Sequence, residues 1–423
     1  MVLRKYKPKV VAVTGSVGKT STKDAIYSAL APEYRTRKSE KSFNSEVGLP
    51  LTILGLQNAW SNPFRWLLNL LDGLFLILFP VRYPEWLVLE AGADRPGDIR
   101  SLAKWLSVDI AVITRLPEVP VHVEFFESPE DVVREKASLI NALKEGGALL
   151  LYADDERTRN LAKRLPVSHQ AKTITFGFSE HADVRGSNFE VVGESGREHL
   201  PIGMKGKISY RGVSAPVEVV GSLGAHSFVP ALAAAAVSAA LGKNLEQAAE
   251  ALRLYAPPPG RMRLLRGLKE STLIDDTYNS SPAAVEAALD TLRHVQPSKS
   301  DLRGRRIAVL GDMLELGRHS VEEHRKAGAH AAKCADLLVT VGFRAHDTAQ
   351  GALDQGMQES NILQYEDSNA AGKELKNLVG EGDIILLKGS QSVRMERAVE
   401  ELLHDPEDAR RLLVRQEREW KRR

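Results

Sequence analysis

Short apolar runs alternate with amphipathic stretches of helical period along most of the 423-residue chain. A run of four to eight apolar residues bounded by turn residues is typical of a buried strand. The alternation of such strands with helices predicts an α/β fold, with doubly wound parallel sheets and helices on both faces. The expected strands are Val10–Thr14, Trp86–Glu90, Asp109–Thr114, Ala148–Ala153, Thr173–Phe178, Thr272–Asp276, Ile307–Gly311, Leu337–Val341 and Asp383–Lys388.

Three stretches interrupt this alternation. Residues 184–220 contain short alternating runs and many glycines, which predicts an antiparallel excursion. The sequence Pro257-Pro258-Pro259-Gly260 is a strong break, and it predicts a boundary between a domain of residues 1–258 and a domain of residues 259–404. Residues 405–423 are predicted to form a basic, exposed helical tail.

The segment Phe64–Val81 is almost entirely apolar. Its polar residues Arg65, Asn69 and Asp72 fall at helical spacing and form one narrow stripe. A membrane span needs about 20 predominantly apolar residues, so these interruptions disfavour a span. Two interpretations stay open: a buried helical hairpin or dimer contact, and a helix that lies in a membrane interface.

Composition narrows the functional classes. The 57 basic and 55 acidic residues leave a formal net charge of +2, which argues against a dedicated nucleic-acid binder. The single cysteine, Cys334, cannot form an intramolecular disulfide and fits a reducing compartment. The N-terminus enters a strand almost at once and shows no cleavable signal pattern. We therefore expect a cytoplasmic protein, with the apolar segment as the one feature that favours membrane association.

The first strand leads into the loop Thr14-Gly15-Ser16-Val17-Gly18-Lys19-Thr20-Ser21 and then into a helical pattern. Glycines let the backbone approach phosphate, and the first amides of a helix point at the bound anion. Lys19 can reach the terminal phosphates, and Thr20 offers a hydroxyl to Mg²⁺. Because Val13 replaces the leading glycine of the usual G-x-x-x-x-G-K-[ST] pattern, we interpret this loop as an atypical P-loop.

Further chemical groups stand at or near the carboxyl ends of other predicted strands, the edge where α/β sheets bind ligands. They are Glu90, the pair His122 and Glu124 followed by Lys136, Asp275 and Asp276, Asp312, and Lys388 with Ser390. Ser128-Pro129-Glu130-Asp131 predicts a helix start before Lys136. Each group taken singly is also typical of turn and capping chemistry, so none of them alone identifies a site.

Taken together, these motifs resemble those of the Mur ligases, in the family's order, from about Pro8 to Glu400. The motifs are TGSVGKTS, NSEVGLPLTIL, LEAGADRPGDI, HVEFF, PPPGRM, DDTYNSSP, LGDMLELG and LLKGSQSVRME. The resemblance is strongest to the branch that adds D-alanyl-D-alanine. It implies a P-loop central domain with a mostly parallel sheet, followed by a Rossmann-like C-terminal α/β domain. By this resemblance we expect no counterpart of the family's N-terminal UDP-binding domain in this sequence, and an insertion at residues 58–83.

The resemblance also implies a mechanism and a site. ATP would phosphorylate a substrate carboxylate, and an amine would then displace phosphate from the acyl phosphate. The implied ligands of ATP are Gly15, Ser16, Gly18, Lys19, Thr20, Ser21, His226, Arg261 and Asp276. The implied ligands of two Mg²⁺ ions are Thr20, Glu90, His122 and Lys136, with Lys136 carbamylated. The implied catalytic residues are Lys19, His122 and Lys136, and the implied substrate contacts are Asn44, Lys388 and Ser390.

Two motifs depart from the family pattern. His226 is retained in the adenine-side motif, but Ser227 and Pro230 stand where asparagines are usual, and proline cannot supply an amide contact. Gln391 stands where the family often has an arginine, next to the expected contacts to the incoming amine.

Three functions are compatible with these motifs. The first is a ligase that adds D-alanyl-D-alanine to a UDP-muramoyl-tripeptide in peptidoglycan precursor synthesis. The second is the same chemistry on another carboxylate, as in folylpolyglutamate synthase or the Mur-like half of cyanophycin synthetase. The third is a nucleotide-binding scaffold docked at a membrane or on a protein through Phe64–Val81, although the retained Lys19 and Glu90 favour an active enzyme.

Overall fold

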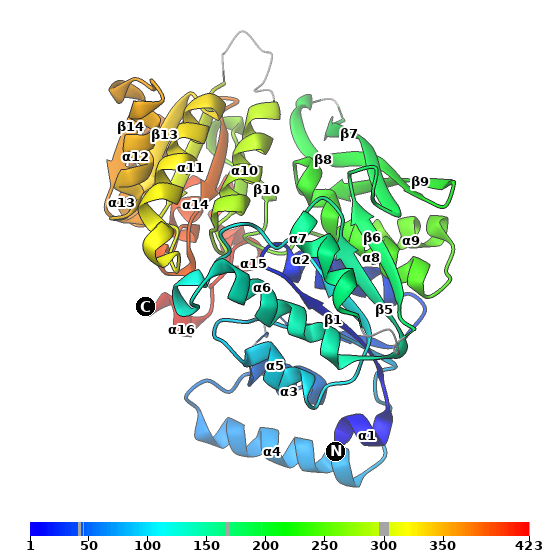
Figure 1. The fold of residues 1–423 in the computed structure, drawn as a ribbon. Coiled ribbons are helices and arrows are strands. Elements are labelled where there is room, and N and C mark those ends of the chain that lie inside the picture. The colour runs from blue at the N-terminus through cyan, green and yellow to red at the C-terminus, as the bar shows by residue number, and fades with distance from the viewer. Residues whose placement is uncertain (41–43, 45, 166–169, 196, 296–303, 423) are drawn as a thin grey trace.

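The computed structural model describes residues 1–40, 44, 46–165, 170–195, 197–295 and 304–422. These residues form two sheets, each with helices packed on its faces (Figure 1). The sheets lie side by side, and the chain passes from the first to the second after strand β9. This architecture confirms the predicted α/β fold with mostly parallel sheets.

The first sheet has nine strands in the order β2-β3-β1-β4-β5-β6-β7-β8-β9. The strands from β2 to β7 pair in parallel, whereas β8 pairs antiparallel with both β7 and β9. The predicted antiparallel excursion is therefore confirmed. The strands are β1 Lys9–Thr14, β2 Thr36–Lys38, β3 Trp86–Glu90, β4 Val108–Ile113, β5 Leu143–Tyr152, β6 Lys172–Gly177, β7 Val184–Glu194, β8 Arg197–Tyr210 and β9 Val213–Val220.

The middle strands of this sheet are buried on both faces, which is why they appear as continuous apolar runs. Alternate residues of β1 point to opposite faces: Val11 and Val13 join one core and Val10 and Ala12 join the other. The helices of this part are α1 Val2–Tyr6, α2 Lys19–Leu30, α3 Gly48–Leu54, α4 Pro63–Leu78, α5 Asp98–Ala103, α6 Pro129–Ala137, α7 Glu156–Arg159, α8 Val229–Ala240 and α9 Leu245–Leu252.

The second sheet has six strands in the order β10-β11-β15-β12-β13-β14. Only β10 and β11 pair antiparallel; the other neighbours are parallel. The strands are β10 Arg263–Arg266, β11 Thr272–Asp276, β12 Arg306–Gly311, β13 Leu337–Val341, β14 Ile362–Tyr365 and β15 Ile384–Lys388. Its helices are α10 Pro282–His294, α11 Ser320–Cys334, α12 Ala345–Asp354, α13 Ser368–Leu378 and α14 Glu396–Leu402.

The tail differs from the predicted exposed helix. It forms the short helices α15 Ala409–Leu412 and α16 Arg418–Lys421, separated by residues without regular secondary structure. Leu413 and Arg415 between them are buried against the second sheet. The Arg415 guanidinium donates to Glu396 Oε2 at 2.9 Å, an ion pair that the composition of the tail did not indicate.

The apolar insertion forms the single helix α4, which lies at the outer end of the molecule beyond α3 and α5 (Figure 1). Asn62 caps its first turn by accepting from Arg65 N, and Gly73 is its one fully buried residue. The buried-hairpin interpretation is therefore wrong, because most of its leucines and phenylalanines are exposed. None of the helices in the described residues combines the length and apolar character needed to cross a membrane.

Candidate active site

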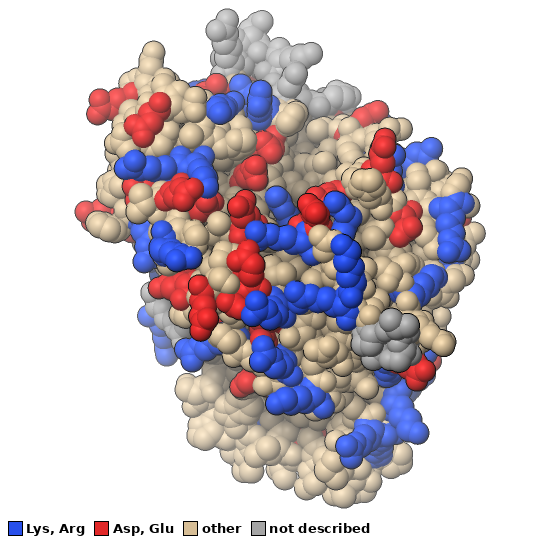
Figure 2. Space-filling view, viewed as in Figure 1, with Lys and Arg blue, Asp and Glu red and all other residues tan. Residues whose placement is uncertain are grey.

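A cavity of about 1190 Å³ lies between the two sheets, where the carboxyl ends of their parallel strands face each other. Acidic and basic side chains gather along the middle of the face shown in Figure 2. Most of the predicted site residues line this cavity: Ser16, Gly18, Lys19, Ser21, Asn44, Glu90, His122, His226, Arg261, Asp276, Lys388 and Ser390. The remaining three, Gly15, Thr20 and Lys136, lie outside its lining, and the first two belong to the same loop and helix.

The P-loop joins β1 to α2. Gly18 precedes the helix with φ of 83°, and a Cβ built there would meet nothing within 4 Å, so its backbone faces open space. Ser16 N donates to Arg115 O at 2.9 Å, and Thr114 Oγ1 donates to Val17 O at 2.7 Å. The loop is thus held in place by the two residues that follow β4. The first amides of a helix have no partner within the helix, so the start of α2 suits an anion.

Gly15 is required by its surroundings, and we expect Gly15→Ala to collapse the loop. Its φ is 137°, and an added Cβ would lie 2.0 Å from Thr114 Oγ1. The clash displaces the hydroxyl that holds Val17, so we predict at least a tenfold weaker affinity for ATP and a lower unfolding temperature. Isothermal titration with ATP and a thermal melt measure both. Gly380→Ala, at a glycine with ordinary φ and 3.6 Å of room, is the matched control. Unchanged ATP binding in Gly15→Ala would contradict this role.

Lys19 lies close enough to Lys136 for its charge to act on the Lys136 amine. Lys19 is half-buried at the start of α2, and burial lowers its pKa despite the opposing effect of Glu90. Lys136 is fully buried near the end of α6, whose N-cap Ser128 accepts from Asp131 N as predicted. Burial, and next the charge of Lys19, lower the pKa of Lys136 to about 7. Its amine is therefore substantially unprotonated near neutral pH.

Glu90 ends β3 with its carboxylate in the cavity wall. The residue is 1% exposed, and its Oε1 accepts from Asn44 Nδ2 at 3.4 Å. Its Oε2 has no hydrogen-bond partner in the described structure. A buried carboxylate oxygen without a partner is costly unless a cation or donor occupies the adjacent space.

His122 lies on the first-sheet side of the cavity and contacts a residue on the second-sheet side. It adopts a left-handed conformation with φ of 70°, and its Nδ1 lies 2.7 Å from Glu315 Oε2 in the second half. Its Nε2 lies 3.5 Å from Asp94 Oδ1. The close approach of His122 lowers the pKa of Glu315. Glu315 and Asp94 stand in two of the motifs, LGDMLELG and LEAGADRPGDI, but neither was among the predicted site residues.

Arg261 and Lys388 are two cations on the second-sheet side of the cavity. Arg261 contacts the first-sheet side, whereas Lys388 contacts a residue of its own sheet. The Arg261 guanidinium stacks on Tyr278, 3.9 Å from the ring centroid, and donates to Thr20 Oγ1 at 3.4 Å. Lys388 is buried, and its Nζ donates to Asp276 Oδ2 at 2.6 Å. Arg261 thus lies against the P-loop, as expected for a residue that closes over the nucleotide, whereas Lys388 is occupied by an internal ion pair.

Ser390 and His226 both line the cavity, Ser390 just after β15 and His226 just before α8. Ser390 Oγ accepts from Leu314 N at 2.8 Å. His226 is the second residue of a 3₁₀ turn before α8, and burial lowers its pKa to about 4, so it is neutral at pH 7. Pro230 lies in the first turn of α8, where its missing N–H removes no helical hydrogen bond.

The structure also brings unpredicted residues to the cavity. Gln57 precedes the insertion, Asn58, Trp60 and Arg65 come from it, and Glu417, Glu419 and Trp420 come from the tail. The Trp60 and Trp420 rings meet edge to face at 6.4 Å between centroids. Only a contact between sequence-distant segments places them here, so no local pattern could have indicated them.

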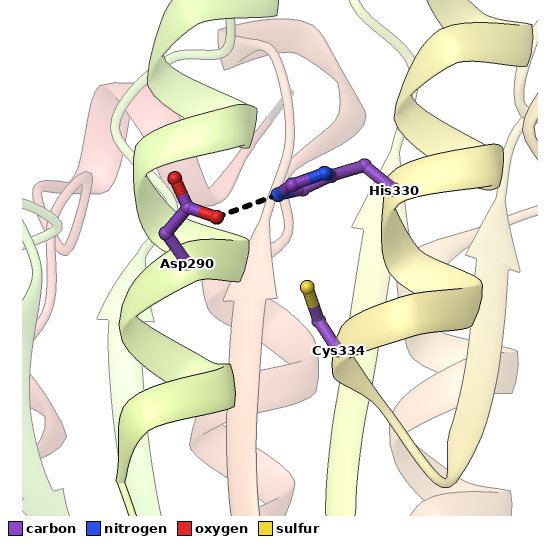
Figure 3. Close-up of side chains that lie close together, drawn as sticks. All are labelled: Asp290, His330 and Cys334. Carbon is purple, nitrogen blue, oxygen red and sulfur yellow. Dashed lines mark hydrogen bonds and ion pairs between the residues drawn. The ribbon is translucent and has the colours of Figure 1, made fainter.

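One cluster of potential metal ligands lies elsewhere, on α10 and α11 (Figure 3). One ligand atom each from Asp290, His330 and Cys334 lies within 4.8 Å of the others. His330 Nε2 and Asp290 Oδ1 are 2.8 Å apart and pair the two helices. The buried Cys334 thiol has a pKa raised by burial, which makes it a poor ligand at neutral pH. We interpret the cluster as a contact between helices.

Two family patterns match this chain, one over the part that forms the first sheet and one over the part that forms the second. The pattern described as the Mur ligase middle domain matches residues 13–64 and 69–238, and that of the Mur ligase glutamate ligase domain matches residues 260–391. The chain belongs to the Mur ligase family. The gap in the first match falls inside α4.

Named relatives and solved structures match nearly the whole chain. The UDP-N-acetylmuramoyl-tripeptide–D-alanyl-D-alanine ligase of Bacillus subtilis is 28% identical over 96% of this chain and 78% of its own length. The MurF ligase of Thermotoga maritima, solved in complex with ADP, superposes with a TM-score of 0.74 and 26% identity over 95% of this chain and 80% of that one. Folylpolyglutamate synthase of Mycobacterium tuberculosis shares the fold, with a TM-score of 0.66, 17% identity, and 94% and 92% coverage.

Proposed function

We propose that this Mur ligase adds D-alanyl-D-alanine to a UDP-muramoyl-tripeptide, using ATP. The observation that carries the proposal is that both sheets line one shared cavity, with the P-loop and Glu90 from the first sheet and Asp276 and Ser390 from the second. A phosphate site on one wall and strand-end polar groups on the other suit two substrates that meet at one reacting carboxyl group. The named function of the Bacillus subtilis relative supports this substrate pair.

The reaction needs two displacements. A carboxylate oxygen of the acceptor attacks the γ-phosphorus of ATP, the bond to the bridging oxygen breaks, and ADP leaves. The amine nitrogen of D-alanyl-D-alanine then attacks the acyl carbon and loses a proton, and inorganic phosphate leaves with the electrons of the C–O bond. Lys19 and the first amides of α2 bind the phosphates, and Arg261 approaches them from the second half of the cavity.

The residues present fit Mg²⁺. The unpartnered Oε2 of Glu90 and the hydroxyl of Thr20 belong to the hard oxygen donors that Mg²⁺ prefers. We assign Thr20 to one ion, and Glu90, His122 and Lys136 to a second. When bound, Mg²⁺ neutralises negative charge on the phosphates. The role of this chain is to hold the acceptor, the nucleotide and the ions in one cavity.

Lys136 is suited to carbamylation by its environment. An ammonium group would repel a nearby cation, whereas a carbamate is an anion. Carbon dioxide reacts only with the free amine, and the lowered pKa of Lys136 supplies that form near pH 7. We infer that the carbamate on Lys136 faces the second ion, beside Lys19.

The remaining assignments concern the two substrates. We assign Asn44, which reaches Glu90, to the acceptor side, and Ser390 to the incoming dipeptide. Lys388 contributes there through Asp276, which it holds in place at 2.6 Å. His226 lies on the adenine side as a neutral ring, so it can both donate and accept a hydrogen bond.

We expect Glu315→Gln to lower the apparent affinity for Mg²⁺ in the activity assay. The Glu315 carboxylate fixes the His122 ring at 2.7 Å, and partners that orient a metal-binding histidine are worth about 10–100-fold in metal affinity or activity. A Mg²⁺ titration of ATP turnover should shift to higher concentration with little change at saturation. Glu322→Gln, at an exposed acid paired with Lys326, is the control. A titration curve that does not move would show that Glu315 plays no part in orienting His122.

The alternative to the UDP-muramoyl-tripeptide is a different carboxylate as the acceptor. Asn58 and Trp60 come from the insertion and line the cavity, so the insertion forms part of the surface that a substrate would meet. The same acyl-phosphate chemistry on another carboxylate would use the same P-loop and Glu90. Folylpolyglutamate synthase shares the fold over nearly its whole length, which shows that two such sheets suffice for the architecture.

Phosphate release from ATP and Mg²⁺, with UDP-muramoyl-tripeptide and D-alanyl-D-alanine, tests the proposal. Product that requires both substrates, identified by mass, is the expected result. Turnover that is stimulated only by a different acid and amine would support the alternative acceptor. ATP binding without turnover on any pair would contradict both and favour a nucleotide-binding scaffold.

A further inference from the structure

Helix α4 exposes an apolar surface that nothing in the described chain covers. Leu70 is 70% exposed, Phe64 67% and Leu78 63%. At 100° per residue, the exposed apolar side chains spread over about half of the helix circumference, opposite the buried Gly73. They are Phe64, Leu67, Leu68, Leu70, Leu71, Leu74, Phe75 and Leu78. A contiguous apolar surface of this kind marks an interaction site.

The helix is fixed in place by hydrogen bonds at both ends. Lys5 Nζ donates to the carbonyl oxygens of Leu76, Ile77 and Phe79 at 3.0, 3.0 and 2.7 Å, which caps the last turn. On the cavity side, Trp66 Nε1 donates to Trp60 O at 2.9 Å. These hydrogen bonds fix the orientation of α4, so its apolar face points away from the rest of the chain before any partner binds.

We propose that α4 docks this protein on an anionic lipid surface, lying flat with its apolar half in the headgroup–acyl boundary. Its 16 residues would extend for about 24 Å, too short to span a bilayer but suited to lying in the interface. The face is convex and lies at the outer end of the molecule, where Figure 2 shows a surface with few charges. A bilayer accepts such a ridge without a complementary groove.

The charges around the helix favour lipid over a second copy of the chain. Arg4 and Lys7 are exposed at one end of α4, Arg82 follows it, and Arg65 is exposed at the other end, whereas Asp72 is the single acid of the helix. Anionic headgroups complement this basic rim. In a two-fold symmetric contact between antiparallel α4 helices, the basic ends would face each other, and like charges disfavour that arrangement.

Docking in this orientation has a consequence for the cavity. Asn58, Trp60 and Arg65, at the start of the insertion, line the cavity wall. The insertion thus connects the lipid-facing helix to the site, and a docked molecule holds this wall of the cavity close to the membrane surface.

Flotation of the full chain with vesicles of phosphatidylglycerol and phosphatidylcholine tests the proposal. Wild type should float with the vesicles, and the double variant Leu71→Glu/Phe75→Glu should partition about a hundredfold more weakly, since two apolar side chains are lost from the interface. Phe343→Glu, at a phenylalanine 86% exposed on the second half of the molecule, is the matched control and should float like wild type. Because all three positions are exposed, thermal melts should be unchanged.

A second double variant tests the basic residues around α4. Lys7→Glu/Arg82→Glu should bind anionic vesicles about tenfold more weakly, with little effect on vesicles of phosphatidylcholine alone. Wild type that stays with the soluble fraction, or a Leu71→Glu/Phe75→Glu variant that floats as well as wild type, overturns the proposal. Light scattering that shows a wild-type dimer, and a monomer in the same variant, overturns it in favour of a second copy.

Discussion

Lys19→Ala should reduce ATP-dependent ligation by about a thousandfold, the effect typical of removing a group that binds developing charge in a closed site. Lys19 begins α2, lines the cavity and has a pKa lowered by burial, so its ammonium is held in a poorly solvated position by the nearby carboxylates of Glu90 and Asp94. Phosphate oxygens would complete that set of partners. Initial rates at saturating ATP and Mg²⁺, with product identified by mass, measure the loss.

Two controls make the Lys19 result specific. Lys104→Ala, at an exposed lysine outside the cavity lining, should keep the wild-type rate. A thermal melt of Lys19→Ala should show a fold that is intact or more stable, because a half-buried charge has been removed. If Lys19→Ala ligated at more than a tenth of the wild-type rate, the P-loop would not be the phosphate site that the proposed mechanism requires.

Lys136→Met should have opposite effects on activity and stability. Without the amine no carbamate can form, and we expect at least a hundredfold loss of ligation. Methionine fills the same buried space without a charge, so the unfolding temperature measured in carbon-dioxide-free buffer should rise. Such an exchange of stability for function is typical of buried charges in active sites.

The stability gained by Lys136→Met has a predicted pH dependence. The pKa of Lys136 is about 7 in the folded chain and near its ordinary value of 10.5 in the unfolded chain. Between those values the unfolded state binds more protons, so wild-type stability rises with pH. The advantage of Lys136→Met is therefore greatest below pH 7, where it amounts to a few kcal/mol, and it disappears as pH approaches 10.5. Urea unfolding at pH 6.5 and 9.5 measures the difference.

Either of two results would contradict the assignment of Lys136. Full ligation by Lys136→Met would show that no carbamate is needed. An equal stability difference at pH 6.5 and 9.5 would show that the amine does not titrate between these values in the folded chain. Lys163→Met, at an exposed lysine that lines no part of the cavity, serves as the comparison for a lysine that is not buried.

Long apolar strands were predictable because burial on both faces imposes continuous apolar runs. Trp86–Glu90, Thr272–Asp276 and Leu337–Val341 have the predicted bounds in the structure. The strands β2, β10 and β14 were missed. Each is only three or four residues long and lies at an edge of its sheet, and a strand covered less completely has no strong apolar signal.

The sequence alone determined the P-loop and the strand-end carboxylate Glu90, because backbone geometry and the end of a buried strand are local properties. It could not give the His122–Glu315 contact, the Trp60–Trp420 contact or the buried ion pair of Arg415 with Glu396.

The same limit applies to the apolar insertion. The composition of Phe64–Val81 was compatible with a buried hairpin, a dimer contact or an interfacial helix. Which side of α4 meets the body was decided by Lys5 at its end and Gly73 against Leu54, contacts made with other segments of the chain. Local sequence fixes which side chains share a helix face, but only the packing of distant segments decides which face is left for water or a partner.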